Sequence, residues 1–125
     1  MSKKSILIIE DEKYLRGVVS DSLKGKGFGV YEAEDGRAGL ELALKIHPDL
    51  ILLDIILPEM DGLAVLRELR GDDWGKNVKV ILLTNLSNPE KMTEAEKLNC
   101  SAYLVKSDWK IDDVLKKIEE TLHKK

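Results

Sequence analysis

The chain has 125 residues, of which 43% are hydrophobic and 34% are charged, and its formal net charge is −3. This composition is typical of one soluble globular domain, and it gives no sign of a surface for nucleic acid or anionic lipid. No apolar run approaches the roughly 18 residues of a membrane-spanning helix, and no signal-peptide pattern opens the chain. We therefore expect a cytoplasmic domain, which the single cysteine, Cys100, also favours.

Five short apolar runs alternate with five longer segments along the chain. The runs, which we interpret as strands, cover residues 5–9, 28–33, 50–53, 78–83 and 102–105. Three of them, the first, third and fourth, contain continuous apolar stretches, as strands do when helices cover both of their faces. The second run is more mixed, as an edge strand would be.

The segments between the runs carry apolar residues at helical spacing. The clearest stripe consists of Ile111, Val114, Leu115, Ile118 and Leu122. Helix starts are predicted at Asn88-Pro89-Glu90 and at Pro58-Glu59, where residues typical of a first helical turn occur. Segment 91–99 has a thin apolar stripe, so we expect its helix to be held loosely.

Strict alternation of strands and helices predicts an α/β fold with parallel strands, right-handed crossovers and helices on both faces of the sheet. Five such units fill the 125 residues. We therefore expect residues 1–125 to form one domain without an output domain.

Polar residues follow four of the five predicted strands. Glu10 and Asp11 follow the first, Asp54 the third, Thr84 the fourth and Lys106 the fifth. In an open α/β sheet, ligands bind beyond the carboxyl ends of the strands, so we expect these side chains to share one site.

These residue types suit phosphoryl transfer together. Three carboxylates are hard oxygen ligands for Mg²⁺, and a carboxylate can itself accept a phosphoryl group. A lysine and a threonine would neutralise and bind the phosphoryl oxygens. Asp54 is the predicted acceptor because it follows the most continuously apolar run, where an acid costs stability unless it is paired or functional.

Each residue also has a simpler interpretation when it is taken alone. Asp11 could cap the next helix, Thr84 could be structural, and Lys106 could be a solvated charge. Their joint occurrence at matching strand ends favours the functional interpretation.

The chain resembles the receiver domain of response regulators in two-component signalling, from residue 5 to about residue 122. The strongest match is segment 53–62, Leu-Asp-Ile-Ile-Leu-Pro-Glu-Met-Asp-Gly. The resemblance implies a flavodoxin-like (βα)5 three-layer sandwich whose parallel five-stranded sheet has the order 2-1-3-4-5.

The resemblance also implies a role for each acidic residue. Asp54 would accept a phosphoryl group from a histidine kinase or a phosphotransfer protein in a Mg²⁺-dependent reaction. Asp11 and Asp54 would bind Mg²⁺ directly, together with the main-chain carbonyl of Ile56. Glu10 would act on the metal through water.

The remaining implied roles concern the readout of the phosphoryl group. Thr84 would bind a phosphoryl oxygen, Lys106 would pair with the phosphoryl group, and Tyr103 would be an aromatic switch. Core packing is the alternative for Tyr103. A downstream protein would read the face formed by the fourth helix, fifth strand and fifth helix. We expect no direct contact with nucleic acid or membrane, and a monomer or weak dimer.

Departures from the family pattern leave alternatives open. Glu10 stands where the family often has Asp, Asn85 where it has a small residue, and Ser107 where it usually has Pro. The last two would support a pseudo-receiver that binds partners without phosphate. An aspartyl-phosphate phosphatase would need an acid at Ile56, so we expect no enzyme beyond one that catalyses its own phosphorylation and dephosphorylation. Apolar Ile56 and Leu86 cannot orient an attacking water, which predicts slow loss of the phosphoryl group.

Overall fold

The computed structural model describes residues 3–84, 89–106 and 110–123. Its elements in chain order are β1 Ser5–Ile9, α1 Lys13–Gly25, β2 Gly29–Ala33, α2 Gly36–Ile46, β3 Leu50–Asp54, α3 Gly62–Arg70, β4 Lys79–Thr84, α4 Pro89–Lys97, β5 Ala102–Val105 and α5 Ile111–His123. The predicted alternation is confirmed, and each predicted strand boundary lies within one residue of the observed one. Among the described residues, no helix is both long enough and apolar enough to cross a bilayer.

The five strands form one parallel sheet in the order β2-β1-β3-β4-β5. This is the predicted flavodoxin-like order, with β3 in the middle and β2 and β5 at the edges. The register pairs Ile9 with Leu53 and Asp54 with Leu83. The carboxyl ends of β1, β3 and β4 therefore lie next to one another.

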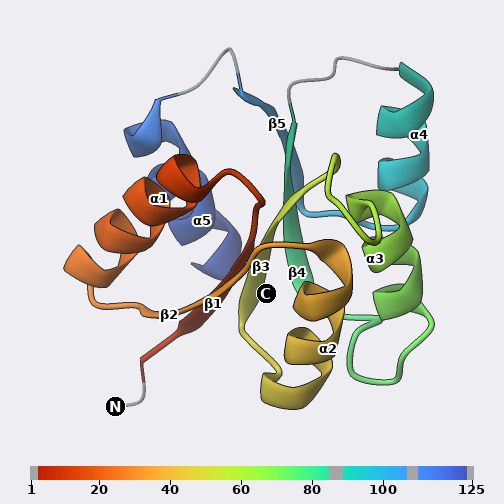
Figure 1. Cartoon of the computed structure of the whole chain (residues 1–125), viewed down its shortest axis with the longest axis horizontal. Helices are drawn as coiled ribbons and strands as arrows, with labels where there is room; N and C mark the ends of the chain where they lie inside the picture. The colour runs from red at the N-terminus through yellow and green to blue at the C-terminus, as the bar shows by residue number, and fades with distance from the viewer. Residues whose placement is uncertain (1–2, 85–88, 107–109, 124–125) are drawn as a thin grey trace.

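Helices cover both faces of the sheet, with α1 and α5 on one side and α2, α3 and α4 on the other (Figure 1). Successive side chains of a strand point to opposite faces. Ile6 and Ile8 of β1 accordingly pack with α1 and α5 residues, whereas Leu7 and Ile9 pack with α2 and α3 residues. Burial on both faces explains why the central strands are continuously apolar.

Helices α4 and α5 differ in how much they bury. The buried residues of α5 are Val114, Leu115, Ile118 and Thr121. Helix α4 buries Ala95 alone. The prediction of a thin apolar stripe on this helix is confirmed, whereas its predicted first-turn neighbour Asn88 lies outside the described residues.

The predicted helix start at Pro58 and Glu59 is wrong. Helix α3 begins at Gly62, where the Asp61 side chain accepts a hydrogen bond from the Ala64 amide at 2.9 Å. Glu59 has a φ of 69°, in the left-handed region, which interrupts any right-handed helix. The residues after β3 therefore form a turn, and Asp61 caps the helix that follows it.

Candidate functional site

The predicted site residues that follow separate strands lie along one edge of the sheet. Glu10 follows β1, Asp54 ends β3, Thr84 ends β4 and Lys106 follows β5. All four strands are parallel and adjacent, so their carboxyl ends meet at this edge. The sheet therefore brings together residues that are up to 96 positions apart in the sequence.

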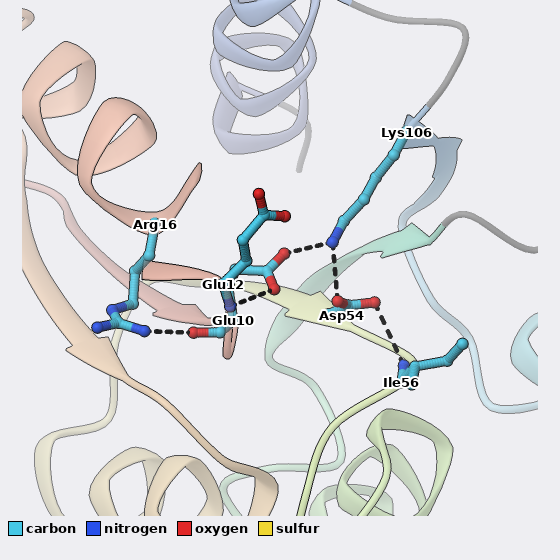
Figure 2. A network of polar contacts seen from close by, with 6 residues as sticks. All are labelled: Glu10, Glu12, Arg16, Asp54, Ile56 and Lys106. Carbon is cyan, nitrogen blue, oxygen red and sulfur yellow. Dashed lines mark hydrogen bonds and ion pairs between the residues drawn. The ribbon is translucent and has the colours of Figure 1, made fainter. Parts of the chain in front are cut away.

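An acidic cluster forms the centre of this edge. Glu10, Asp11 and Asp54 each offer a carboxylate oxygen, and these oxygens lie within 4.8 Å of one another. Glu10 and Asp54 are buried, whereas Asp11 is exposed. The Lys106 Nζ lies between the two buried acids, 2.5 Å from Glu10 Oε1 and 2.8 Å from Asp54 Oδ2 (Figure 2).

The charge of Lys106 is set by two opposed effects. Burial lowers the pKa of the Lys106 ammonium, but hydrogen bonds and charge attraction from Asp54 and Glu10 raise it, and the net shift is upward. Lys106 is therefore fully charged at neutral pH. Among the described residues, one ammonium beside three carboxylates gives the site an excess of negative charge that favours a cation.

The turn after β3 fixes the position of Asp54. The Ile56 amide donates a hydrogen bond to Asp54 Oδ1 at 3.2 Å, and the Gly62 amide donates to the Ile55 carbonyl at 2.7 Å. A Cβ at Gly62 would stand 2.1 Å from the Asp54 carbonyl oxygen. Only glycine therefore allows the start of α3 to pack so closely over the acidic residue.

The turn after β1 fixes Glu10 in a similar way. The Glu10 amide donates to the Ala33 carbonyl at 3.0 Å, and Glu10 Oε2 accepts a hydrogen bond from the Glu12 amide at 3.0 Å. Helix α1 has Glu12 at its N-cap position and no side-chain cap. The capping interpretation of Asp11 is therefore wrong, and Asp11 belongs to the acidic cluster.

Sequence reasoning missed the contact of Arg16 with the site. Arg16 Nη1 donates a hydrogen bond to the Glu10 carbonyl at 2.7 Å, and its Nε donates to Glu32 Oε1 at 3.1 Å (Figure 2 shows Arg16 beside Glu10). Glu32 Oε2 in turn accepts from the Ser20 hydroxyl at 3.2 Å. Helical spacing does not distinguish Arg16 from the solvated charges of α1, so the sequence carried no signal for this role.

The predicted switch residues lie on adjacent strands. Thr84 is fully buried at the end of β4, and Tyr103 of β5 is partly buried against the core on the α2 and α3 side. Their switch roles stay predictions. The departures Asn85 and Ser107, and the apolar neighbour Leu86, lie outside the described residues.

The donor set of the cluster fits a small divalent cation. Carboxylate oxygens from two strand ends are the hard ligands that such ions prefer, and the exposed Asp11 leaves one side of the cluster open to water. The predicted contribution of the Ile56 carbonyl stays a prediction.

Comparison with known proteins gives the family. The model of the response regulator receiver domain matches residues 6–119. This match covers most of the chain, and the chain belongs to the receiver domain family of two-component response regulators.

Curated relatives differ in how much of them the chain spans. It is 33% identical to the Brucella ovis polar-differentiation response regulator DivK, over 82% of this chain and 84% of DivK. It is 27% identical to the Bacillus subtilis sporulation initiation phosphotransferase F, over 98% of this chain and 96% of that protein. The Synechocystis DNA-binding dual master transcriptional regulator RpaA is 33% identical over 95% of this chain, which spans only 49% of RpaA.

Solved structures share the fold. A CheY-like receiver domain protein from Methanospirillum hungatei superposes with a TM-score of 0.90 and 28% identity, covering 97% of this chain and 94% of that one. The receiver domain of a Pseudomonas aeruginosa sensor histidine kinase, which holds a magnesium ion in its active site cleft, gives a TM-score of 0.87 and 25% identity, with 98% and 100% coverage.

Proposed function

We propose that the chain is a phosphoacceptor switch in which Asp54 accepts a phosphoryl group from a phosphohistidine of a kinase or phosphotransfer protein. The observation that carries this proposal is the arrangement of Glu10, Asp11, Asp54 and Lys106, with three carboxylates within 4.8 Å and an ammonium 2.8 Å from Asp54. A relative that the chain spans almost fully is named a phosphotransferase, which supports the same chemistry.

In this reaction an Asp54 carboxylate oxygen attacks phosphorus. The new O–P bond forms as the P–N bond breaks, and the imidazole nitrogen leaves with the bonding electron pair. Lys106 already contacts Asp54 Oδ2, so its charge is placed to neutralise the transferred oxygens. The chain then catalyses only its own phosphorylation and dephosphorylation.

A Mg²⁺ ion fits this proposal. Asp11 and Asp54 would hold it directly, with the Ile56 carbonyl as a further ligand and Glu10 acting through water, and it would supply charge neutralisation at the phosphoryl oxygens. The Pseudomonas aeruginosa neighbour with magnesium in its cleft supports the choice of metal.

The proposed readout lies at the face of α4, β5 and α5, where a partner protein would bind. Thr84 lies on β4, between β3 with Asp54 and β5 with Tyr103, and α4 buries a single residue. Movement of Thr84 towards the phosphoryl group can therefore be transmitted to a helix that is held loosely.

The test is phosphorylation of the intact chain with acetyl phosphate and Mg²⁺, followed by intact mass spectrometry. We expect one added phosphoryl group in the wild type and none in Asp54→Asn. Asp35→Asn is the matched control, because Asp35 caps α2 and Asn caps helices equally well. Equal phosphorylation of Asp54→Asn would contradict the assignment, and no phosphorylation or beryllofluoride binding in any variant would favour the pseudo-receiver.

A further inference from the structure

Arg16 of α1 links the acidic cluster to the edge strand β2. Its guanidinium donates to the main-chain carbonyl of Glu10 at 2.7 Å and pairs with Glu32 of β2 at 3.1 Å. The Arg16 side chain is only 13% exposed. It is thus a packed charge with two defined partners, unlike a solvated surface arginine.

The contact with Glu10 acts on the backbone of the turn that carries two of the three acids. The Glu10 amide is held by Ala33 of β2, and the Glu10 carbonyl is held by Arg16, so both sides of this residue are fixed. Asp11 follows directly, and its own side chain is exposed. The direction of both carboxylates therefore depends on the orientation of the Glu10–Asp11 peptide.

Arg16 is itself held in place by Glu32, which accepts two hydrogen bonds. Glu32 accepts from Arg16 through one carboxylate oxygen and from the buried Ser20 hydroxyl through the other. A planar guanidinium can bond a carboxylate and a carbonyl at once with fixed geometry, which a lysine ammonium cannot reproduce.

We propose that Arg16 is a positioning residue for the cation site: it holds the Glu10–Asp11 turn so that both acids face Asp54. This inference rests on the proposed Mg²⁺ site but concerns a residue outside the set of ligands. Residues that hydrogen-bond to metal ligands without touching the metal typically raise metal affinity about 10- to 100-fold.

The first experiment is calorimetric titration of the unphosphorylated chain with MgCl₂. We expect Arg16→Met to raise the Kd for Mg²⁺ about tenfold, and Arg16→Lys, which keeps a single donor nitrogen, to raise it by a smaller factor. Glu32→Gln leaves Arg16 in place but weakens its support, and we expect a rise of about threefold. The Glu32→Gln variant keeps the test decisive if Arg16→Met does not fold.

A kinetic measurement separates positioning from chemistry. The Mg²⁺ concentration for half-maximal phosphorylation by acetyl phosphate should rise by the same factor in Arg16→Met as the Kd. The rate at saturating Mg²⁺ should stay within about twofold of the wild type, since Arg16 does not touch Asp54.

Arg70→Met is the matched control. Arg70 also donates to main-chain carbonyls, those of Leu98 at 2.6 Å and Asn99 at 3.0 Å, but at the end of α4. We expect this variant to lose stability without a change in the Kd for Mg²⁺. If Arg16→Met loses stability yet binds Mg²⁺ with the Kd of the wild type, the positioning role of Arg16 is overturned and the proposed function is not. A wild type that takes up neither Mg²⁺ nor a phosphoryl group would overturn the proposed function instead.

Discussion

The acidic edge of the sheet and helix α4 are held by different forces. At the acidic edge, buried charges are fixed by the ends of β1, β3 and β5 and by backbone hydrogen bonds of the following turns. Helix α4 buries Ala95 alone and depends on polar contacts with α3. Arg70 bonds the carbonyls of Leu98 and Asn99 beyond its end, and Arg67 pairs with Glu94 on its surface.

The difference matches what the proposed switch would need. The proposed reaction at Asp54 needs groups whose positions do not relax, and the central strands hold these groups. The proposed readout needs an element that can shift at little cost, and a helix with one buried residue loses little apolar contact when it moves.

The largest expected effect is on the fixed charges. Lys106→Met removes the ammonium between two buried carboxylates, and breaking such a pair costs about 3 kcal/mol of unfolding free energy. Urea denaturation measures the loss, and millimolar Mg²⁺ should restore part of it by binding the freed acids. Lys117→Met, which breaks an exposed pair with Glu120, is the control and should change stability by less than about 1 kcal/mol. Equal losses of unfolding free energy in the two variants would mean that the buried pairs of Lys106 stabilise the fold no more than an exposed pair does.

The same lysine predicts a dependence on pH. The folded-state pKa of Lys106 is raised above its ordinary value of 10.5, so its stabilising contribution is complete below that pH and is lost as pH rises through the folded-state value. Unfolding free energy measured between neutral pH and strongly alkaline pH should fall more in the wild type than in Lys106→Met. Parallel curves for the two proteins would show that Lys106 is not the responsible group.

A smaller effect is expected at the polar contacts of α4. Arg70→Met should cost about 2 kcal/mol, because it leaves part-buried carbonyls without their charged donor. Hydrogen exchange should show faster opening of α4 than of α5. Arg67→Met, which loses only an exposed ion pair, should change exchange little. If Arg70→Met accelerates hydrogen exchange equally across the chain, α4 does not open as a separate unit.

The exposed Ile56 beside Asp54 predicts a long-lived phosphoryl group, since its side chain cannot orient water. Ile56→Gln should shorten the lifetime about tenfold, equivalent to about 1.4 kcal/mol of activation free energy. Ile56→Val is the apolar control and should leave it unchanged. Decay of the wild-type phosphoryl group within seconds would contradict the prediction.

The smallest effect concerns Cys100, which follows α4 and whose amide donates to the Ala95 carbonyl at 3.2 Å. Burial raises the pKa of its thiol against the opposing charge of Arg70, so labelling should be slower than in the unfolded chain. Labelling of Cys100 should nevertheless proceed through local opening of α4. We expect it to be about tenfold faster than labelling of a cysteine placed on α5, in the double variant Thr121→Cys and Cys100→Ser. Equal rates would place both helices in one cooperative unit.

Much of the fold was predictable because its signals are local. Continuous apolar stretches at residues 50–53 and 80–83 indicate strands with two covered faces, and five alternations leave few possible topologies. The start of α3 was mispredicted, because Pro58 and Glu59 resemble a first helical turn while the close approach of Gly62 to Asp54 requires a turn there.

The sequence by itself determined the strand ends at which Glu10, Asp54, Thr84 and Lys106 lie, because apolar runs end where polar residues begin. Only the tertiary structure decided which charges touch. Lys106 lies between two acids, and Arg16 donates a hydrogen bond to the Glu10 carbonyl. The rings of Trp74 and His47 are stacked, with their centroids 4.4 Å apart. Each of these contacts joins separate segments of the chain. Such contacts depend on side-chain directions in three dimensions, which periodicity along one element cannot specify.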